Sequence, residues 1–139
     1  MSELRHFPGS SQTIEIVLDG TATGGELAVM TLRVPPGAGA PAHRHTLESE
    51  TLLVREGSLA VEVEGERRDL RTGSAVHIPR GVLHAFVSDS GAVVDVLVLP
   101  AGLEDFFRAI CALEPDAPPA DPAVVAAAME RHGLDFSGT

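Results

Sequence analysis

From about Thr13 to Pro100, short runs rich in Val, Ile, Leu and Thr are interrupted every eight to ten residues by Gly, Pro or Asp/Ser pairs. Alternating apolar runs bounded by turn residues are typical of β-strands. Many short strands at regular spacing in one domain predict a sandwich or barrel, so we expect an all-β fold here. The expected strands are 13–18, 27–34, 50–55, 58–64, 66–70, 75–78, 84–88 and 93–99, with Gly57 separating the third from the fourth.

The hydrophobic period changes after Pro100. A helical stripe follows, formed by Leu103, Phe106, Phe107, Ile110 and Leu113. The sequence predicts both ends of a second helix, with Asp121 as N-cap, Pro122 at the first helical position and Gly133 just past the end. We therefore expect one domain over residues 1–139, with a barrel at about 13–100 and two short helices within about 102–133.

Composition narrows the classes of partner. The chain has 139 residues, with 10 Lys+Arg against 20 Asp+Glu and a formal net charge of −10. An acidic surface repels phosphate backbones and anionic lipid, so we expect no nucleic-acid partner and no membrane partner. No apolar run approaches the ~18 residues of a membrane span, and the first residues lack the pattern of a secretory signal, which favours a cytoplasmic location. Cys111 is the only cysteine, so a metal site would need His and carboxylate ligands.

A candidate metal site is found between Gly37 and Ser88. His43 and His45 are two residues apart, so in an extended strand both imidazoles point to the same side. Glu50 has the opposite strand parity and can join them only if the chain turns or bulges at residues 46–48. His84 comes from a later strand. Three imidazoles and one carboxylate suit a divalent Zn, Fe, Ni, Co or Mn ion.

On these residues the chain resembles the cupins, which are metal-binding barrels of the double-stranded β-helix, or jelly-roll, type. Their first motif, G-x5-H-x-H-x4-E-x6-G, is matched by Gly37, His43, His45, Glu50 and Gly57, and their second, G-x5-P-x-G-x2-H-x3-N, by Gly73, Pro79, Gly81 and His84. Ser88 replaces the usual Asn, which we expect to weaken support around the strand turn. The resemblance implies His43, His45, Glu50 and His84 as ligands, and the single barrel with C-terminal helices is similar to quercetin-dioxygenase-like monocupins.

Several residues have competing interpretations. Glu48 shares strand parity with Glu50 and is the alternative carboxylate ligand, although the resemblance selects Glu50. His77 is expected to be a strand residue beside the barrel mouth, and His6 and His132 need no role beyond the terminal segment and a helix end. Asp95 interrupts an apolar strand and is either an outward-facing residue, which we favour, or an acid inside the barrel. Cys111 is expected to be packed rather than nucleophilic.

The expected function follows from two open coordination positions on an octahedral ion, which can chelate a bidentate oxygen ligand. Strand parity suggests an apolar cavity lined by Met30 and Leu32, or their neighbours, with Leu52, Val54 and Phe86. Glu50 is then the candidate catalytic base.

We expect a dioxygenase-like metalloenzyme acting on a small molecule. The alternatives are a non-redox zinc cyclase or isomerase, and a metal-bearing binding or sensor barrel without turnover. The alternating first strand at 13–18, as an exposed edge, favours a homodimer. The phenylalanine pair at 106–107 and the C-terminal helices could cap the barrel, cover an edge or join that interface.

Overall fold

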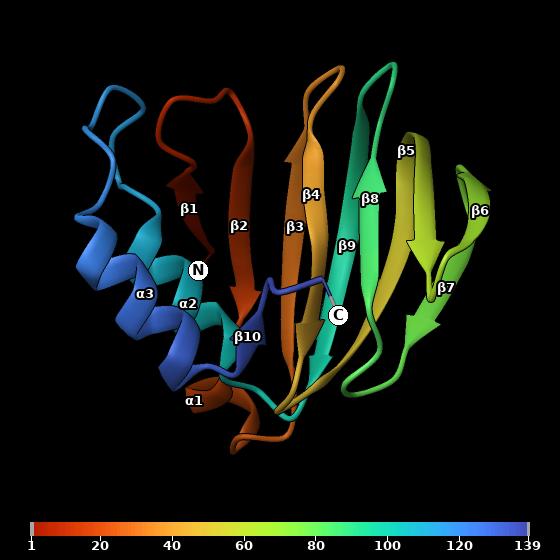
Figure 1. Cartoon of the computed structure of the whole chain (residues 1–139). Helices are drawn as coiled ribbons and strands as arrows, with labels where there is room; N and C mark the ends of the chain where they lie inside the picture. Colours follow the sequence, from red (N-terminus) through yellow and green to blue (C-terminus); the bar gives the residue numbers. More distant parts are fainter. Residues whose placement is uncertain (1, 139) are drawn as a thin grey trace.

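The computed structural model describes residues 2–138, so the chain ends Met1 and Thr139 of the expected domain lie outside it. It is a curled antiparallel sheet with helices packed at one side (Figure 1). The elements are β1 (Glu3–His6), β2 (Thr13–Leu18), α1 (Gly20–Thr23), β3 (Ala28–Val34), β4 (Gly39–His45), β5 (Ser49–Val63), β6 (Glu66–Arg71), β7 (Ala75–Ile78), β8 (His84–Val87), β9 (Ala92–Leu99), α2 (Leu103–Ile110), α3 (Pro122–Arg131) and β10 (Leu134–Asp135). This architecture confirms the expected jelly-roll barrel with two short C-terminal helices.

One long strand joins the two halves of the barrel. The first part of β5 pairs with β7 and β9, and its second part pairs with β6 and β8. The register shifts between Val54 and Glu56, and Gly57 follows with a φ of 79°. The prediction that Gly57 separates two strands is therefore wrong, because the strand continues through it. A left-handed residue bends β5 at the point where its partner strands change from β7 and β9 to β6 and β8.

The core is built by alternation, as the sequence predicts. Residues at every second position of β2, β3, β5 and β9 are buried, and apart from the buried Thr31 the residues between them face outward or are half-buried. The largest fully buried side chains include Ile14, Met30, Leu52, Leu59 and Ile78. His84 belongs to the same group of fully buried side chains. The interior is thus apolar over most of its length and imidazole-lined at one point.

The first predicted strand is not an edge. Glu3–His6 form β1, which pairs antiparallel with β2, and His6 makes a further bridge to Ala112. Arg5 and Arg108 join this region electrostatically, since each forms an ion pair with Glu3. The edge-strand argument for a homodimer is therefore wrong. The homodimer itself and the cytoplasmic location stay predictions.

The C-terminal helices lie against one side of the barrel, beside β1 and β2 in Figure 1. Asp121 caps α3 through a hydrogen bond from the backbone N–H of Ala123, which confirms the predicted start. Helix α2 ends at Ile110, so Leu113 lies beyond it and is exposed rather than part of the stripe. Among the described residues, no helix is long and apolar enough to cross a bilayer.

Candidate metal centre

The candidate ligands come from both halves of the barrel. His43 on β4 lies directly opposite His84 on β8, and His45 ends β4 two residues later. The chain then bends at Thr46 and Leu47 before β5 begins, as the sequence required for Glu50 to join the histidines. Glu50 therefore enters from the first part of β5, between β7 and β9. All four side chains are buried.

The imidazole nitrogens divide into outer and inner atoms. His43 Nδ1 is 2.7 Å from the carbonyl oxygen of Pro41, and His84 Nδ1 is 2.9 Å from that of Val82. A carbonyl oxygen can only accept, so both Nδ1 atoms carry the proton and both Nε2 atoms keep a free lone pair. His45 Nδ1 is 3.2 Å from Glu48 Oε1, which leaves its Nε2 free in the same way.

The inner atoms converge. The Nε2 atoms of His43 and His45 are 3.1 Å apart, and Glu50 lies 3.5 Å from His45 Nε2 and 3.4 Å from His84 Nε2 through its two carboxylate oxygens. His84 Nε2 is buried and has no hydrogen-bond partner among the described residues. Two atoms that bind one ion at about 2.0–2.2 Å lie roughly 2.8–3.6 Å apart, so the spacing fits a metal ion.

The three histidines form one group of possible ligand atoms, all within 4.8 Å of one another, that could hold a metal ion. Glu50 touches two of them, and its role as a fourth ligand stays a prediction. The donor set of imidazole nitrogen with carboxylate oxygen suits a divalent transition metal and does not select which one.

The electrostatics favour a neutral His43 and an ionised Glu50, which are the forms that coordinate metals. Burial, assisted by the neighbouring His84, lowers the pKa of His43 to about 4, so this imidazole is neutral at pH 7. Burial opposes ionisation of Glu50, but His84, His45 and His43 hold the pKa of its carboxyl below the usual range. For His45, burial is outweighed by Glu48 and Glu50, which raise its pKa. The centre thus places an ionised carboxylate among imidazoles.

The other histidines and acids lie away from this centre. His77 is exposed on the outer face, where its Nδ1 is 2.9 Å from Thr51 Oγ1. Asp95 also faces outward and accepts hydrogen bonds from Thr31 and Arg55. Cys111 is buried, and burial raises the pKa of its thiol to about 12. His6 pairs with the segment after α2, and His132 caps the end of α3.

Ser88 supports the strand turn in place of the usual Asn. Its hydroxyl donates to the carbonyl of Ser58 at 2.7 Å and accepts from the backbone N–H of Gly91 at 2.9 Å, and the residue is 1% exposed. Ser88 thus satisfies two backbone groups of neighbouring segments, and the expected weakening relative to Asn stays a prediction.

A cavity of about 510 Å³ is lined by His43, His45 and Glu50. Leu32, Leu52 and Phe86 line it, as strand parity predicts, and their contact with a substrate stays a prediction. The prediction needs correction for Met30 and Val54, which have no exposed surface and pack inside the barrel core away from the cavity lining. Both side chains alternate inward as predicted, but each is fully covered by its core neighbours.

The C-terminal segment supplies a wall that the sequence analysis did not assign. The cavity is lined by Phe106, Phe107 and Ile110 of α2, by Val125 and Met129 of α3, and by Leu134 and Phe136. The helices therefore cap the barrel opening, which was one of three alternatives for the phenylalanine pair. Phe136 stacks on the ring of His43, with centroids 5.1 Å apart. The alternation of Leu134 and Phe136 after Gly133 is a weak strand signal that could have pointed to this segment.

Strand β10 attaches this wall to the candidate ligands. Leu134 pairs with His45 and Asp135 with Arg44, and the carbonyl of Gly133 accepts hydrogen bonds from the backbone N–H and the hydroxyl of Thr46. A Cβ atom on Gly133 would overlap the Thr46 hydroxyl. The tail is thus held against the strand that carries His43 and His45.

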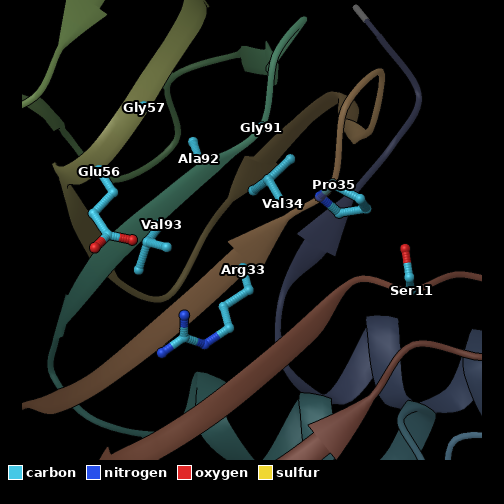
Figure 2. Close-up of a pocket in the computed structure, with 9 residues that line it drawn as sticks. All are labelled: Ser11, Arg33, Val34, Pro35, Glu56, Gly57, Gly91, Ala92 and Val93. Atoms are coloured by element: carbon cyan, nitrogen blue, oxygen red, sulfur yellow. The ribbon is translucent and has the colours of Figure 1, made fainter.

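A second cavity of about 330 Å³ lies outside this centre (Figure 2). Its lining comes from β3, β5 and β9, with Arg33 and Glu56 as its charged side chains and Gly57 and Gly91 among the rest. It contains none of the histidines. The 510 Å³ cavity is therefore the candidate functional site.

Comparison with known proteins gives a family match. A family model described as a cupin domain matches residues 30–100. Quercetin 2,3-dioxygenase from Bacillus subtilis is 31% identical over 100 residues, which cover 71% of this chain and 30% of that protein. Pectin degradation protein KdgF from Dickeya dadantii is 31% identical over 70 residues, or 50% of this chain and 64% of that protein. The chain thus spans less than two thirds of the length of either relative.

A solved structure agrees with this match. KdgF from Halomonas sp. superposes with a TM-score of 0.62 at 25% identity, covering 68% of this chain and 83% of that chain. The described barrel is therefore similar to that of the Halomonas KdgF. The C-terminal residues that line the cavity lie beyond residues 30–100, which the cupin family model matches.

Proposed function

Because this chain belongs to the cupin family, we propose that it is a metal-dependent enzyme of dioxygenase type that acts on a small, apolar, oxygen-bearing molecule. One observation carries the proposal. His43, His45 and Glu50 line a cavity whose other lining is mostly aliphatic and aromatic, with no Lys, Arg or Asp among the described residues that line it. Such a cavity favours a ligand with an apolar body and a polar end directed to the histidines.

The proposed ligand set is His43, His45, His84 and Glu50, around one Fe, Ni, Mn, Co or Zn ion. When bound, the ion would supply Lewis acidity that lowers the pKa of a chelating hydroxyl group and, for a redox-active metal, reactivity toward O2. Glu50 has a lowered pKa and is therefore ionised, so its carboxylate, when it is not coordinating the ion, could accept that hydroxyl proton at Oε1 or Oε2. The aromatic wall around Phe86, Phe106 and Phe136 excludes water from the same space.

The two relatives suggest different substrates, and the cavity favours one of them. The name of the Bacillus protein refers to quercetin, a polyphenol, whereas KdgF is named for pectin degradation, which yields acidic sugars. An acidic sugar is recognised by cationic side chains and many hydrogen-bond donors. The described lining offers Ser10 and Gln12 as its uncharged polar side chains and no cation. An aromatic diol or hydroxyketone fits this lining better.

The test combines metal content with oxygen uptake. Untagged protein purified without chelator is analysed for transition metals, and O2 consumption is followed with a flavonol and with a catechol. His45→Ala should lose both the metal and the uptake. His77→Ala is the matched control, because His77 lies on the exposed outer face, and it should keep both.

Each result has a distinct meaning. About one Fe, Ni, Co or Mn per chain with O2 uptake supports the dioxygenase proposal. Zinc with no uptake would replace it with a cyclase or isomerase, and a protein that is stabilised by ligand without turnover would replace it with a binding or sensor barrel. Wild-type protein that binds no metal would contradict the site itself.

A further inference from the structure

We propose that Glu48 is a positioning residue, which holds the imidazole of His45 in the tautomer and orientation needed to bind a metal ion. This inference deepens the proposed function and rests on the metal site at its centre. It also changes the meaning of Glu48, which the sequence presents as an alternative ligand.

The geometry places Glu48 behind His45. Glu48 is buried, with a side chain that is 5% exposed, and the side chain of His45 is 6% exposed. Glu48 Oε1 lies 3.2 Å from His45 Nδ1. The opposite ring nitrogen, Nε2, lies 3.1 Å from His43 Nε2 and 3.5 Å from Glu50 Oε2. The carboxylate and the centre of convergence are therefore on opposite edges of one imidazole ring. From that position Glu48 acts on the ion through His45.

His45 differs from the other two histidines in how it is held. His43 and His84 each donate through Nδ1 to the backbone carbonyl two residues earlier, at Pro41 and Val82. The Nδ1 partner of His45 is a side chain instead. Because His45 ends β4 and the chain bends immediately after it, a residue beyond the bend supplies the acceptor. The same bend that brings Glu50 to the histidines thus also brings Glu48 behind His45.

Energetics argue against a purely structural role for Glu48. A carboxyl group removed from water costs free energy unless it is well hydrogen-bonded. Among the described residues, His45 is the one hydrogen-bond partner of the Glu48 side chain. An apolar side chain of similar size would fill the same buried space without that cost. A carboxylate behind a ligating imidazole, in contrast, fixes the tautomer and raises the basicity of the ring, and loss of such partners weakens metal affinity by about 10–100-fold.

The test measures metal affinity directly. Protein stripped of metal is titrated with Co(II) against a chromophoric chelator, in the wild type and in Glu48→Ala, Glu48→Gln and Ser49→Ala. We expect the Kd of Glu48→Ala to rise by about 10–100-fold. Glu48→Gln should lose less, because the amide oxygen still accepts from Nδ1. Ser49→Ala is the matched control next in the chain, since its hydroxyl only reaches the carbonyl of Leu99 at 3.4 Å, and it should bind like the wild type.

Two spectroscopic measurements separate positioning from general damage. The visible spectrum of bound Co(II) should keep its shape in both Glu48 variants, because the ligand atoms are unchanged. In the Zn(II) form, a slowly exchanging imidazole N–H resonance of His45, assigned in the wild type by correlation within ¹⁵N-labelled histidine rings and to neighbouring protons, should shift in Glu48→Gln and vanish in Glu48→Ala. If the Ala variant does not fold by circular dichroism, the Gln variant carries the comparison.

Three results would overturn the inference. Folded Glu48→Ala that binds Co(II) as tightly as Ser49→Ala would show that Glu48 does not support His45. Complete loss of stoichiometric Co(II) binding in Glu48→Ala, together with an altered Co(II) spectrum in Glu48→Gln, would make Glu48 a ligand itself. Wild-type protein that binds no Co(II) would remove the metal site and this inference together, which distinguishes failure of the proposed function from failure of the role of Glu48.

Discussion

Gly57 offers a sharp test of how the two halves of the barrel are joined. It lies where β5 passes from one set of partner strands to the other, and its φ is 79°. A Cβ atom there would overlap the carbonyl oxygen of Gly91 and lie 3.0 Å from the Cα of Ala92. All of these neighbours are backbone atoms of the turn into β9, so they cannot move away as a flexible side chain would.

The magnitude follows from comparison with Gly73. Gly73 also has a positive φ, 89°, but a Cβ atom there meets nothing within 4 Å. Gly73→Ala therefore costs only the left-handed strain of about 1–2 kcal/mol, part of which is offset by a less flexible unfolded chain. Gly57→Ala adds the displacement of a packed backbone, which costs about 1–3 kcal/mol more. We expect Gly57→Ala to be about 2 kcal/mol less stable than Gly73→Ala.

The assay is urea unfolding of both variants and the wild type in the presence of EDTA, so that bound metal does not add stability. In a thermal melt of the same two variants, a difference of about 2 kcal/mol corresponds to roughly 6–10 °C in Tm for a chain of this size. Equal midpoints for the two variants would refute the reasoning, because they would mean that β5 and the Gly91 turn do not approach each other as described.

Three further predictions test other parts of the molecule. Ser88→Ala leaves the Ser58 carbonyl and the Gly91 N–H without their buried partner, so its unfolding free energy should fall by about 2 kcal/mol in urea titrations. Burial raises the pKa of Cys111 from 9.0 to about 12, so the folded chain holds this proton where the unfolded chain releases it. Stability should therefore fall as pH rises above 9, by about 2 kcal/mol at pH 10.5, and this pH slope should be absent in Cys111→Ala. Phe136→Ala should keep one metal per chain but weaken binding of 4-nitrocatechol, followed by its absorbance, by about 2–12-fold, and unchanged binding would exclude Phe136 from the ligand wall.

The sequence predicts the barrel and the histidine group because both depend on local periodicity. Alternation places His43 and His45 on one face, and the odd spacing to Glu50 predicts the bend found at Thr46 and Leu47. The direct pairing of His43 with His84 is not local, since it depends on how β4 meets β8 across the barrel. There the motif resemblance, rather than strand parity, made the prediction.

Other features were missed because their signals are short or because they depend on packing between strands. Strand β1 has four residues and β10 has two, and neither shows enough alternation to be recognised before its partner strand is known. Parity gives the side of a sheet but not which inward side chains are covered by their neighbours, so it could not tell that Met30 is fully buried whereas its register partner Val96 and Leu32 line the cavity. Glu48 shares strand parity with Glu50, but after the bend that follows His45 its carboxylate lies beside His45 Nδ1, on the outer edge of that ring.

The division between matched and unmatched residues bears on how far the relatives can guide the choice of substrate. All four candidate ligands lie within residues 30–100, the region matched by the cupin family model. About half of the cavity lining lies outside it, including Phe7 before the match and Phe106 and Phe136 after it. The candidate metal ligands thus belong to the matched region, whereas the size and apolar character of the cavity depend also on segments that the match does not cover. A substrate carried over from a relative therefore has to be tested against this wall, and the sharpest comparison is between an aromatic chelator and a small aliphatic one such as acetohydroxamate. Shortening Phe136 should weaken the aromatic chelator and leave the aliphatic one unchanged, and equal effects on both would place the wall outside the binding step.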